Sequence, residues 1–262
     1  MSAALLGCLA LSACADEPPA RAEVVDVAQS GIGPAELAVI VNDADPDSVA
    51  LAKYYVARRG IPAANLIHVR FDPGQPNLTR GRFEPLKKQV DANTPAGVQA
   101  YVLTWAAPYR VDCMAITSAF AFGFDQRFCA TGCKPTQSVA YFDSAVLRPY
   151  AEMGLRPTMS LAAPSLAEAK RLVDRGVVAD GGNPSGTAYL ASTTDRLRNV
   201  RAFGYAAAVE KLSPVFKLEI ARLNGLEGKR DVMAYFTGLE HVPLIDHNTY
   251  LPGALADHLT SA

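Results

Sequence analysis

Three carboxylates stand at alternate positions of one short segment, where they could bind a cation. Asp43, Asp45 and Asp47 follow the apolar run 37–41, and open α/β sheets bind ligands at this carboxyl edge of their strands. Alternate carboxylates there could hold a hard cation such as magnesium or calcium. Helix capping explains the same residues more simply, because Asp45 precedes Pro46 and Asp47 suits the positive end of a helix. We therefore expect capping and no resident metal, with the three carboxylates as the alternative ligands.

Histidine supplies general acids and bases near neutral pH, and the chain has four. His68 falls within a stretch that has the pattern of a strand, and we expect a half-buried structural side chain there. His247 and His258 each follow an aspartate directly, but neighbouring side chains on a strand or helix point apart. A catalytic triad would have to assemble in space. We expect solvated polar residues here, with His241 and His258 as the candidate catalytic bases.

The chain opens with an apolar run, residues 1–11, that is only about half as long as a bilayer-spanning helix. Such a run is typical of a signal peptide, and an ordinary buried helix is the alternative. The run ends at Leu11-Ser12-Ala13-Cys14, which resembles the lipobox of bacterial lipoproteins. In that family the cysteine thiol is diacylated and the chain is cut just before it. The resemblance implies a signal peptide over residues 1–13, a lipid on Cys14 and a tether over residues 14–34.

A lipidated Cys14 implies a protein of the bacterial cell envelope, anchored to the membrane and facing the periplasm or the cell surface. Two or three acyl chains hold a protein on a membrane stably, whereas one does so only marginally. The first positive side chain is Arg21. Either the α-amino group therefore supplies the positive start of the signal, or the reading frame begins upstream.

Three cysteines remain once the signal peptide is removed and Cys14 is lipidated: Cys113, Cys129 and Cys133. An oxidising compartment favours disulfides. Cys129 and Cys133 share a short glycine-containing loop that could close a small ring, so we expect them to pair, although Cys113 could equally take one of these partners. Zinc bound by three cysteines and a histidine is the less favoured alternative. The leftover thiol is either inert or reactive, which makes Cys113 a candidate nucleophile.

Strand and helix patterns alternate along the rest of the chain. A buried-type strand at 37–41, a helix from Pro46 to Gly60 and a strand at 65–71 predict a βαβ unit with a right-handed crossover. The same patterns predict further helices at 83–90, 143–153, 165–175 and 194–212, and further strands at 98–105, 187–191, 215–220 and 231–236. The alternation predicts an α/β fold, with a mainly parallel sheet and flanking helices, in one domain over residues 35–262.

The segment 106–137 lacks such a pattern and is rich in aromatic residues and cysteines. It is too long for a passive connection. Irregular segments of this length usually cover a site or a partner surface.

Composition and motifs exclude several classes of function. The chain has 262 residues and a net charge of -1, so it has ample length for a core but no basic excess. We therefore expect no nucleic-acid partner. The turn after the first strand contains neither a GxGxxG motif nor a P-loop, so we expect no dinucleotide or ATP cofactor.

Three segments carry a resemblance to a known family. They are Val39-Ile40-Val41-Asn42 with Arg59-Gly60-Ile61-Pro62, Tyr101-Val102-Leu103-Thr104 with Pro108, and Tyr235-Phe236-Thr237-Gly238 with residues 251–261. Together they resemble an uncharacterised family of bacterial envelope proteins, often encoded in genomes with exosortase-type sorting systems. The resemblance spans most of residues 36–261 and implies no known activity. It also implies a further glycine-rich segment after Ser261, and therefore a chain truncated at this end.

A more distant similarity links that family to the gingipain-like cysteine peptidases, which have a caspase-like fold. Their catalytic histidine lies in a strand-terminal Thr-Gly-His-Gly, and the matching stretch here is Thr237-Gly238-Leu239-Glu240, so leucine replaces the histidine. His241 lies two residues beyond Leu239. The nucleophilic cysteine should end a following strand, yet residues 250–253 contain none. An activated thiolate needs a base within hydrogen-bond reach, so the sequence argues against a working peptidase of this design.

The sequence predicts a lipid-anchored, non-catalytic α/β envelope protein that binds another protein or a polysaccharide in export or surface sorting. The competing hypothesis is a cysteine hydrolase of gingipain-like ancestry. Its centre would be Cys113 or an Asp-His pair, with His241 or His258 as the base.

Overall fold

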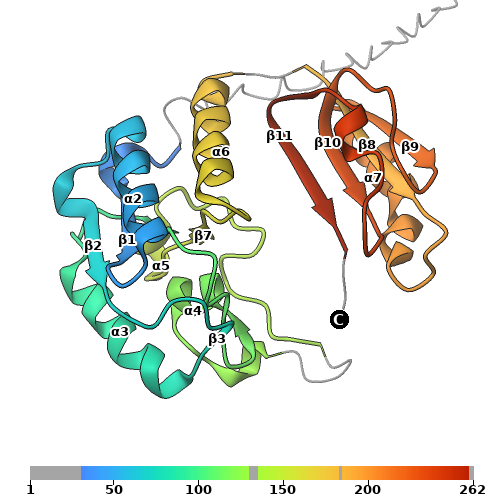
Figure 1. Cartoon of the computed structure of the whole chain (residues 1–262). Helices are drawn as coiled ribbons and strands as arrows, with labels where there is room; N and C mark the ends of the chain where they lie inside the picture. The colour runs from blue at the N-terminus through green and yellow to red at the C-terminus, as the bar shows by residue number, and fades with distance from the viewer. Residues whose placement is uncertain (1–30, 130–134, 183–184, 260–262) are drawn as a thin grey trace, which may run out of the picture.

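The computed structural model describes residues 31–129, 135–182 and 185–259. Within them the chain forms two parallel four-stranded sheets and one small three-stranded sheet, flanked by helices (Figure 1). The predicted α/β class with mainly parallel strands is confirmed, and the strands divide between separate sheets. The predicted signal peptide, Cys14 with its lipid, and Cys133 lie outside the described residues.

The first sheet has the strand order β2-β1-β4-β7. Its strands are β1 (Leu37–Asn42), β2 (Leu66–Val69), β4 (Ala100–Leu103) and β7 (Thr158–Ser160). The helices around it are α2 (Pro46–Arg59), α3 (Arg80–Asn93), α5 (Pro149–Met153) and α6 (Leu166–Ala179). Three short 3-10 helices also lie in this part of the chain: η1 (Pro34–Glu36), η2 (Ala63–Asn65) and η3 (Gln126–Phe128). The predicted helix at 143–153 is thus limited to its last five residues.

Strand β1 lies at the centre of the core because both of its faces are covered. Ala38 and Ile40 belong to the apolar cluster that includes α3, whereas Val39 and Val41 belong to the cluster that includes α2. Successive side chains of a strand point to opposite faces. An uninterrupted apolar strand therefore fits a parallel sheet with helices on both sides.

The start of α2 confirms the predicted capping. The Asp45 carboxylate accepts a hydrogen bond of 3.0 Å from the N–H of Asp47, and Pro46 occupies the first helical turn. Gly60 ends the helix with φ at 64°, in the left-handed region that favours glycine. Asp45, Pro46 and Gly60 thus fix where the helix of the first crossover begins and ends.

The segment 106–137 contains regular elements that the sequence pattern does not reveal. They are the strands β5 (Arg110–Val111) and β6 (Met114–Ala115) and the helix α4 (Ile116–Phe122). Strand β5 is the middle strand of the small sheet and pairs with β3 (Asn77–Leu78) on one side and with β6 on the other. Phe120 of α4 packs edge-on against Phe83 and Trp105, with ring centroids 5.2 and 6.0 Å apart. The prediction of an irregular loop is therefore wrong for this part of the segment. Its aromatic side chains extend the core of the first sheet.

The second sheet has the strand order β11-β10-β8-β9. Its strands are β8 (Thr187–Ser192), β9 (Lys217–Arg222), β10 (Val232–Thr237) and β11 (Tyr250–His258), and its helical segments are η4 (Asn199–Gly204), α7 (Tyr205–Leu212) and η5 (Ile245–His247). The predicted helix at 194–212 becomes a 3-10 helix followed by α7. The Asp195 carboxylate accepts hydrogen bonds from the N–H groups of Leu197 and Arg198, and such local bonds compete with an α-helical start.

Helix α6 lies between the two large sheets, against α2 on one side and β11 on the other (Figure 1). At the β11 contact a Cβ built on Gly253 would lie 3.0 Å from the Cβ of Ala179. The close approach and the positive φ of Gly253, 79°, both favour glycine there. Within the described ranges, no helix is long and apolar enough to cross a bilayer.

Candidate functional site

An open crevice lies at the carboxyl edge of the first sheet. The chain connects β1 to β2 at one side of β1 and then returns to β4 at the other, so the strand order reverses between β1 and β4. Open α/β sheets bind ligands at such a switch point. The crevice has a volume of about 390 Å³ and is lined by Asp45, Asp47, Leu51, Trp105, Ala106 and Leu161, among others.

Buried hydrogen bonds fix the inner wall of this crevice. The N–H of Asn42 donates to Ser48 Oγ at 3.0 Å, and Ser48 Oγ lies 2.9 Å from Thr104 Oγ1. Thr104 Oγ1 in turn donates to the carbonyl of Ile40 at 3.1 Å. Because the Thr104 proton is used in this way, the Ser48 hydroxyl donates to Thr104. Ser48 is therefore committed to structure, and none of these bonds prepares it as a nucleophile.

The three carboxylates of the alternative metal site do not converge. Asp45 caps α2, and Asp43 Oδ1 lies 2.8 Å from His68 Nδ1 across the ends of β1 and β2. Asp47 lies in the first turn of α2. Within the part of the chain that the structure describes, no group of three or more His, Cys, Asp or Glu side chains could hold a metal ion.

Cys113 forms a disulfide with Cys129, with the two Cα atoms 5.3 Å apart. This finding corrects the expected pairing of Cys129 with Cys133. The hairpin of β5 and β6 turns at Cys113, and α4 then carries the chain back so that Cys129, directly after η3, meets it. Cys113 therefore has no free thiol, and a nucleophilic role for it would require the disulfide to be reduced.

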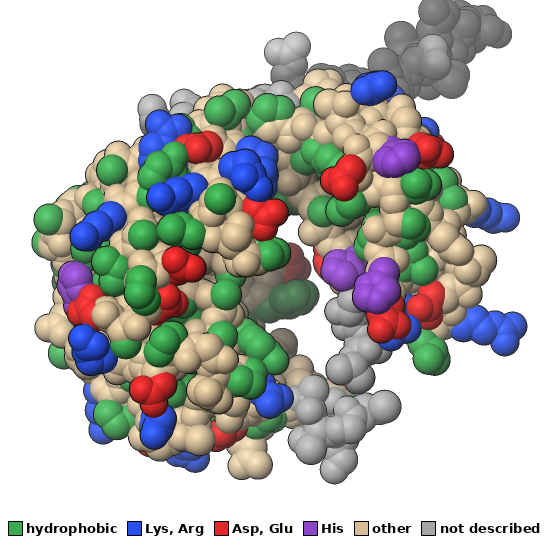
Figure 2. Space-filling view, viewed as in Figure 1, with side chains coloured by type: hydrophobic (Ala, Val, Ile, Leu, Met, Phe, Trp, Pro, Cys, Tyr) green, Lys and Arg blue, Asp and Glu red, His purple; other side chains and the backbone are tan. Residues whose placement is uncertain are grey.

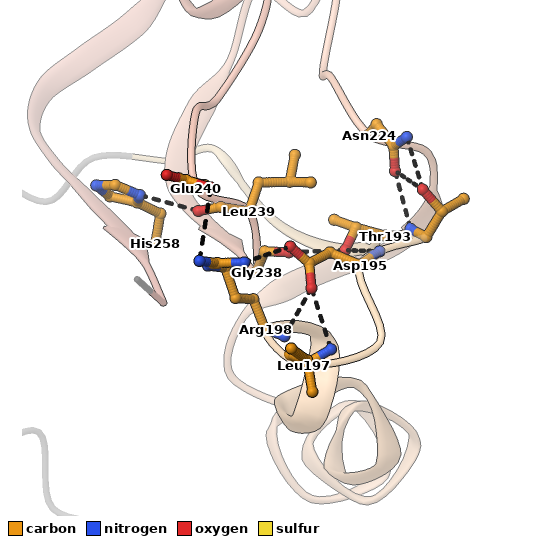
Figure 3. Close-up of polar contacts among 10 residues, drawn as sticks. Thr193, Asp195, Leu197, Arg198, Asn224, Gly238, Leu239, Glu240 and His258 are labelled. Atoms are coloured by element: carbon orange, nitrogen blue, oxygen red, sulfur yellow. Dashed lines mark hydrogen bonds and ion pairs between the residues drawn. The ribbon is translucent and has the colours of Figure 1, made fainter. Parts of the chain in front are cut away.

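The carboxyl edge of the second sheet holds the positions where the gingipain-like resemblance places the catalytic pair (Figure 3). Strand β10 ends at Thr237, and the parallel register sets Thr237 beside His258, the last residue of β11. The following strand thus ends at His258, and not near residues 250–253 as the sequence suggested. His258 Nδ1 lies 3.3 Å from the carbonyl oxygen of Leu239. At this edge an imidazole therefore faces a backbone carbonyl, and no described cysteine lies beside it.

An Arg198-centred network occupies the same edge. Arg198 Nη1 lies 3.1 Å from Asp195 Oδ2, and Arg198 Nη2 lies 3.6 Å from Glu240 Oε2. Hydrogen bonds from the backbone N–H and the side chain of Arg198 hold the pKa of Asp195 below its ordinary value, against a smaller opposing effect of burial. Thr193 Oγ1 donates to the carbonyl of Gly238 at 2.8 Å. These contacts tie the loops after β8 and β10 together.

The candidate catalytic residues are not brought together. Cys113 belongs to the small sheet beside the first large sheet. His241 follows β10 and His258 is the last residue of β11, and both are exposed. His241 makes no hydrogen bond or ion pair with the described residues. Figure 2 shows His side chains over the second sheet and another at the outer edge of the first. Among the residues that the structure describes, the geometry provides no Cys-His pair.

Two features of the candidate sites were not predicted from the sequence. His68 is exposed rather than half-buried and faces Asp43, a pairing that depends on the register of β1 against β2. Trp105, the only tryptophan of the chain, lines the crevice. Its position at the carboxyl end of the predicted strand 98–105 was the available signal, because residues at the ends of parallel strands lie at the carboxyl edge.

Comparison of the chain with protein-family models, with curated proteins and with solved structures found no match.

Proposed function

We propose that this chain is a lipid-anchored, non-catalytic protein of the bacterial cell envelope, which binds another protein or a polysaccharide in export or surface sorting. The observation that carries the proposal is the disulfide between Cys113 and Cys129. It takes up the sulfur atom that a cysteine hydrolase would need. It also fits an oxidising compartment, in which structural disulfides form and persist.

The crevice of the first sheet is the proposed binding site. Its lining combines apolar side chains and the edge of Trp105 with the carboxylates of Asp45 and Asp47. A mostly apolar concavity with a few polar groups is typical of ligand sites. Carboxylates at its rim could accept hydrogen bonds from sugar hydroxyls or from the N–H groups of a peptide.

We expect Cys113 and Cys129 to resist alkylation in the native protein and to be alkylated after reduction, because the disulfide leaves neither with a thiolate. Peptide mapping after iodoacetamide treatment measures this for each cysteine. As the matched control, Cys129→Ala combined with Cys133→Ala leaves Cys113 unpaired and should make it reactive. Stoichiometric labelling of Cys113 in the untreated protein, lost when His241 or His258 becomes alanine, would instead establish the cysteine hydrolase.

The anchor is tested by Cys14→Ser. We expect this variant to leave the membrane fraction of a bacterial host after a high-salt wash, because the remaining apolar run of residues 1–11 is only about half of a membrane-spanning length. Cys8→Ser is the control, since Cys8 lies within the predicted signal peptide, and it should stay with the membranes. A Cys14→Ser protein that still resists the wash would rule out the lipid anchor.

A further inference from the structure

The segment from Asp195 to Lys217, which we term the η4–α7 segment, exposes an unusual concentration of large apolar side chains. Leu197 is 78% exposed, Phe203 is 91% exposed and Val215 is 74% exposed, and Val200, Leu212 and Phe216 are exposed as well. The segment forms the outer layer on one face of the second sheet, where α7 buries Tyr205. Exposed apolar groups gathered in this way usually mark an interaction surface.

The helical geometry of η4 aligns three of these side chains. A 3-10 helix has three residues per turn, so side chains at i and i+3 eclipse one another. Leu197, Val200 and Phe203 follow this spacing along η4 and the turn that precedes it. They therefore form one apolar row.

The neighbouring row shows why the apolar row faces solvent. Arg198 and Arg201 also have the i and i+3 spacing, and both are held toward the carboxyl edge of the sheet. Arg198 pairs with Asp195 and Glu240, and Arg201 lies 2.9 Å from Asp257 of β11. Because these ion pairs fix the rotation of η4, the apolar row is held away from the sheet.

The other end of the segment adds a cavity suited to hydrocarbon. Between α7 and the sheet lies an open cavity of about 350 Å³, whose walls include Tyr205, Leu212, Phe216, Phe236 and Leu255. The lining side chains are apolar, apart from the hydroxyl that Tyr205 carries. Such a cavity is suited to an acyl chain, and it offers no charged group for a polar ligand.

The charge of the segment indicates what covers this surface. Residues 195–217 contain five basic side chains, Arg196, Arg198, Arg201, Lys211 and Lys217, and two acidic ones, Asp195 and Glu210, for a net charge of +3. Three of the basic side chains pair with carboxylates outside the segment: Arg198 with Glu240, Arg201 with Asp257 and Lys217 with Asp231. The whole chain has a net charge of -1. The side chains of Arg196 and Lys211 make no hydrogen bond or ion pair with the described residues, so their charges remain available to an external anion.

We propose that the η4–α7 segment is a membrane-contact surface that lies on anionic phospholipid. The row of Leu197, Val200 and Phe203 enters the boundary between headgroups and acyl chains, while Arg196 and Lys211 attract the lipid phosphates. Interleaved basic and large apolar side chains are the usual composition of segments that lie in a membrane interface. Each basic residue near an anionic surface adds to the attraction. This surface would orient a chain that its Cys14 lipid already holds at the membrane.

The test uses full-length protein with Cys14→Ser, so that no lipid anchor contributes. Phe203→Trp in this background places an indole on the apolar row, and Phe142→Trp places one at a site that is 78% exposed and lies outside the segment. The probes are vesicles of phosphatidylcholine alone and of phosphatidylcholine mixed with phosphatidylglycerol. We expect the mixed vesicles to shift the emission of Phe203→Trp to shorter wavelength and to leave that of Phe142→Trp unchanged.

Binding is measured on the same vesicles by sedimentation. Phe203→Ser should weaken binding about tenfold or more, because a buried Phe side chain contributes about 1.5–3 kcal/mol, whereas Phe142→Ser should bind as the parent protein does. Equal shifts at positions 203 and 142, or binding that Phe203→Ser does not change, would overturn the proposal. So would self-association in solution that Phe203→Ser abolishes, since a second copy would then cover the surface. None of these outcomes depends on whether Cys14 is lipidated in cells.

Discussion

Replacing Phe120 with alanine is expected to lower the free energy of unfolding by about 4 kcal/mol, within the range of 3–5 kcal/mol for buried Phe→Ala changes. Phe120 is fully buried, and its ring lies edge-on to those of Phe83 and Trp105. The substitution removes an aromatic ring and leaves a cavity among side chains that α3, α4 and the end of β4 hold in place. The loss therefore combines the lost burial with an unfilled space.

Urea unfolding followed by circular dichroism measures this loss, and the single tryptophan, Trp105, reports the same site by fluorescence. Phe142→Ala is the matched control, because Phe142 is 78% exposed and should change the free energy of unfolding by no more than about 0.5 kcal/mol. If Phe120→Ala is as stable as Phe142→Ala, α4 does not belong to the core. In that case segment 106–137 would be the irregular loop that its sequence suggests.

The first βαβ unit could be predicted because local signals and burial agree there. The apolar run of β1, the Asp45 cap with Pro46 and the glycine at position 60 each mark a boundary of the observed elements. Other elements lack such agreement. Strand β11 contains Pro252 and Gly253, two residue types that argue against a strand interior. They are tolerated because β11 lies at the edge of its sheet.

For the candidate sites, the sequence could predict only which residues lie near the ends of strands. Alternation of strands and helices places Asp43, Asp45 and Asp47 after the carboxyl end of the first strand, as observed. The partner of Cys129 could not be predicted in this way, because the chain must first turn through β5, β6 and α4 to meet Cys113. Sequence spacing favoured the nearer Cys133. Pairings across the fold depend on such turns and on register, which the hydrophobic pattern leaves undetermined.

The close approach of Gly238 to the backbone of Arg198 and Asn199 also depends on the path of the chain. It predicts a large loss of stability when Gly238 is replaced. A Cβ built on Gly238 would lie 2.0 Å from the carbonyl oxygen of Arg198, 2.5 Å from its carbonyl carbon and 2.9 Å from the backbone nitrogen of Asn199. All three are backbone atoms, so no side-chain rotation can make room. The loop after β10 must separate from the turn that leads into η4, and the Thr193 bond to the Gly238 carbonyl is strained with it.

We therefore expect Gly238→Ala to lower the free energy of unfolding by about 3 kcal/mol, at the upper end of the usual cost of overpacking. The control is Gly97→Ala, since nothing lies within 4 Å of a Cβ at Gly97, and this change should be neutral or slightly stabilising. Urea unfolding compares the two variants. The same displacement would move Arg198 away from Glu240 and loosen the row of Leu197, Val200 and Phe203, so Gly238→Ala should also weaken vesicle binding. Equal stability of the two alanine variants would mean that β10 and η4 do not meet at Gly238, and the ion pairs that orient the apolar row would lose their support.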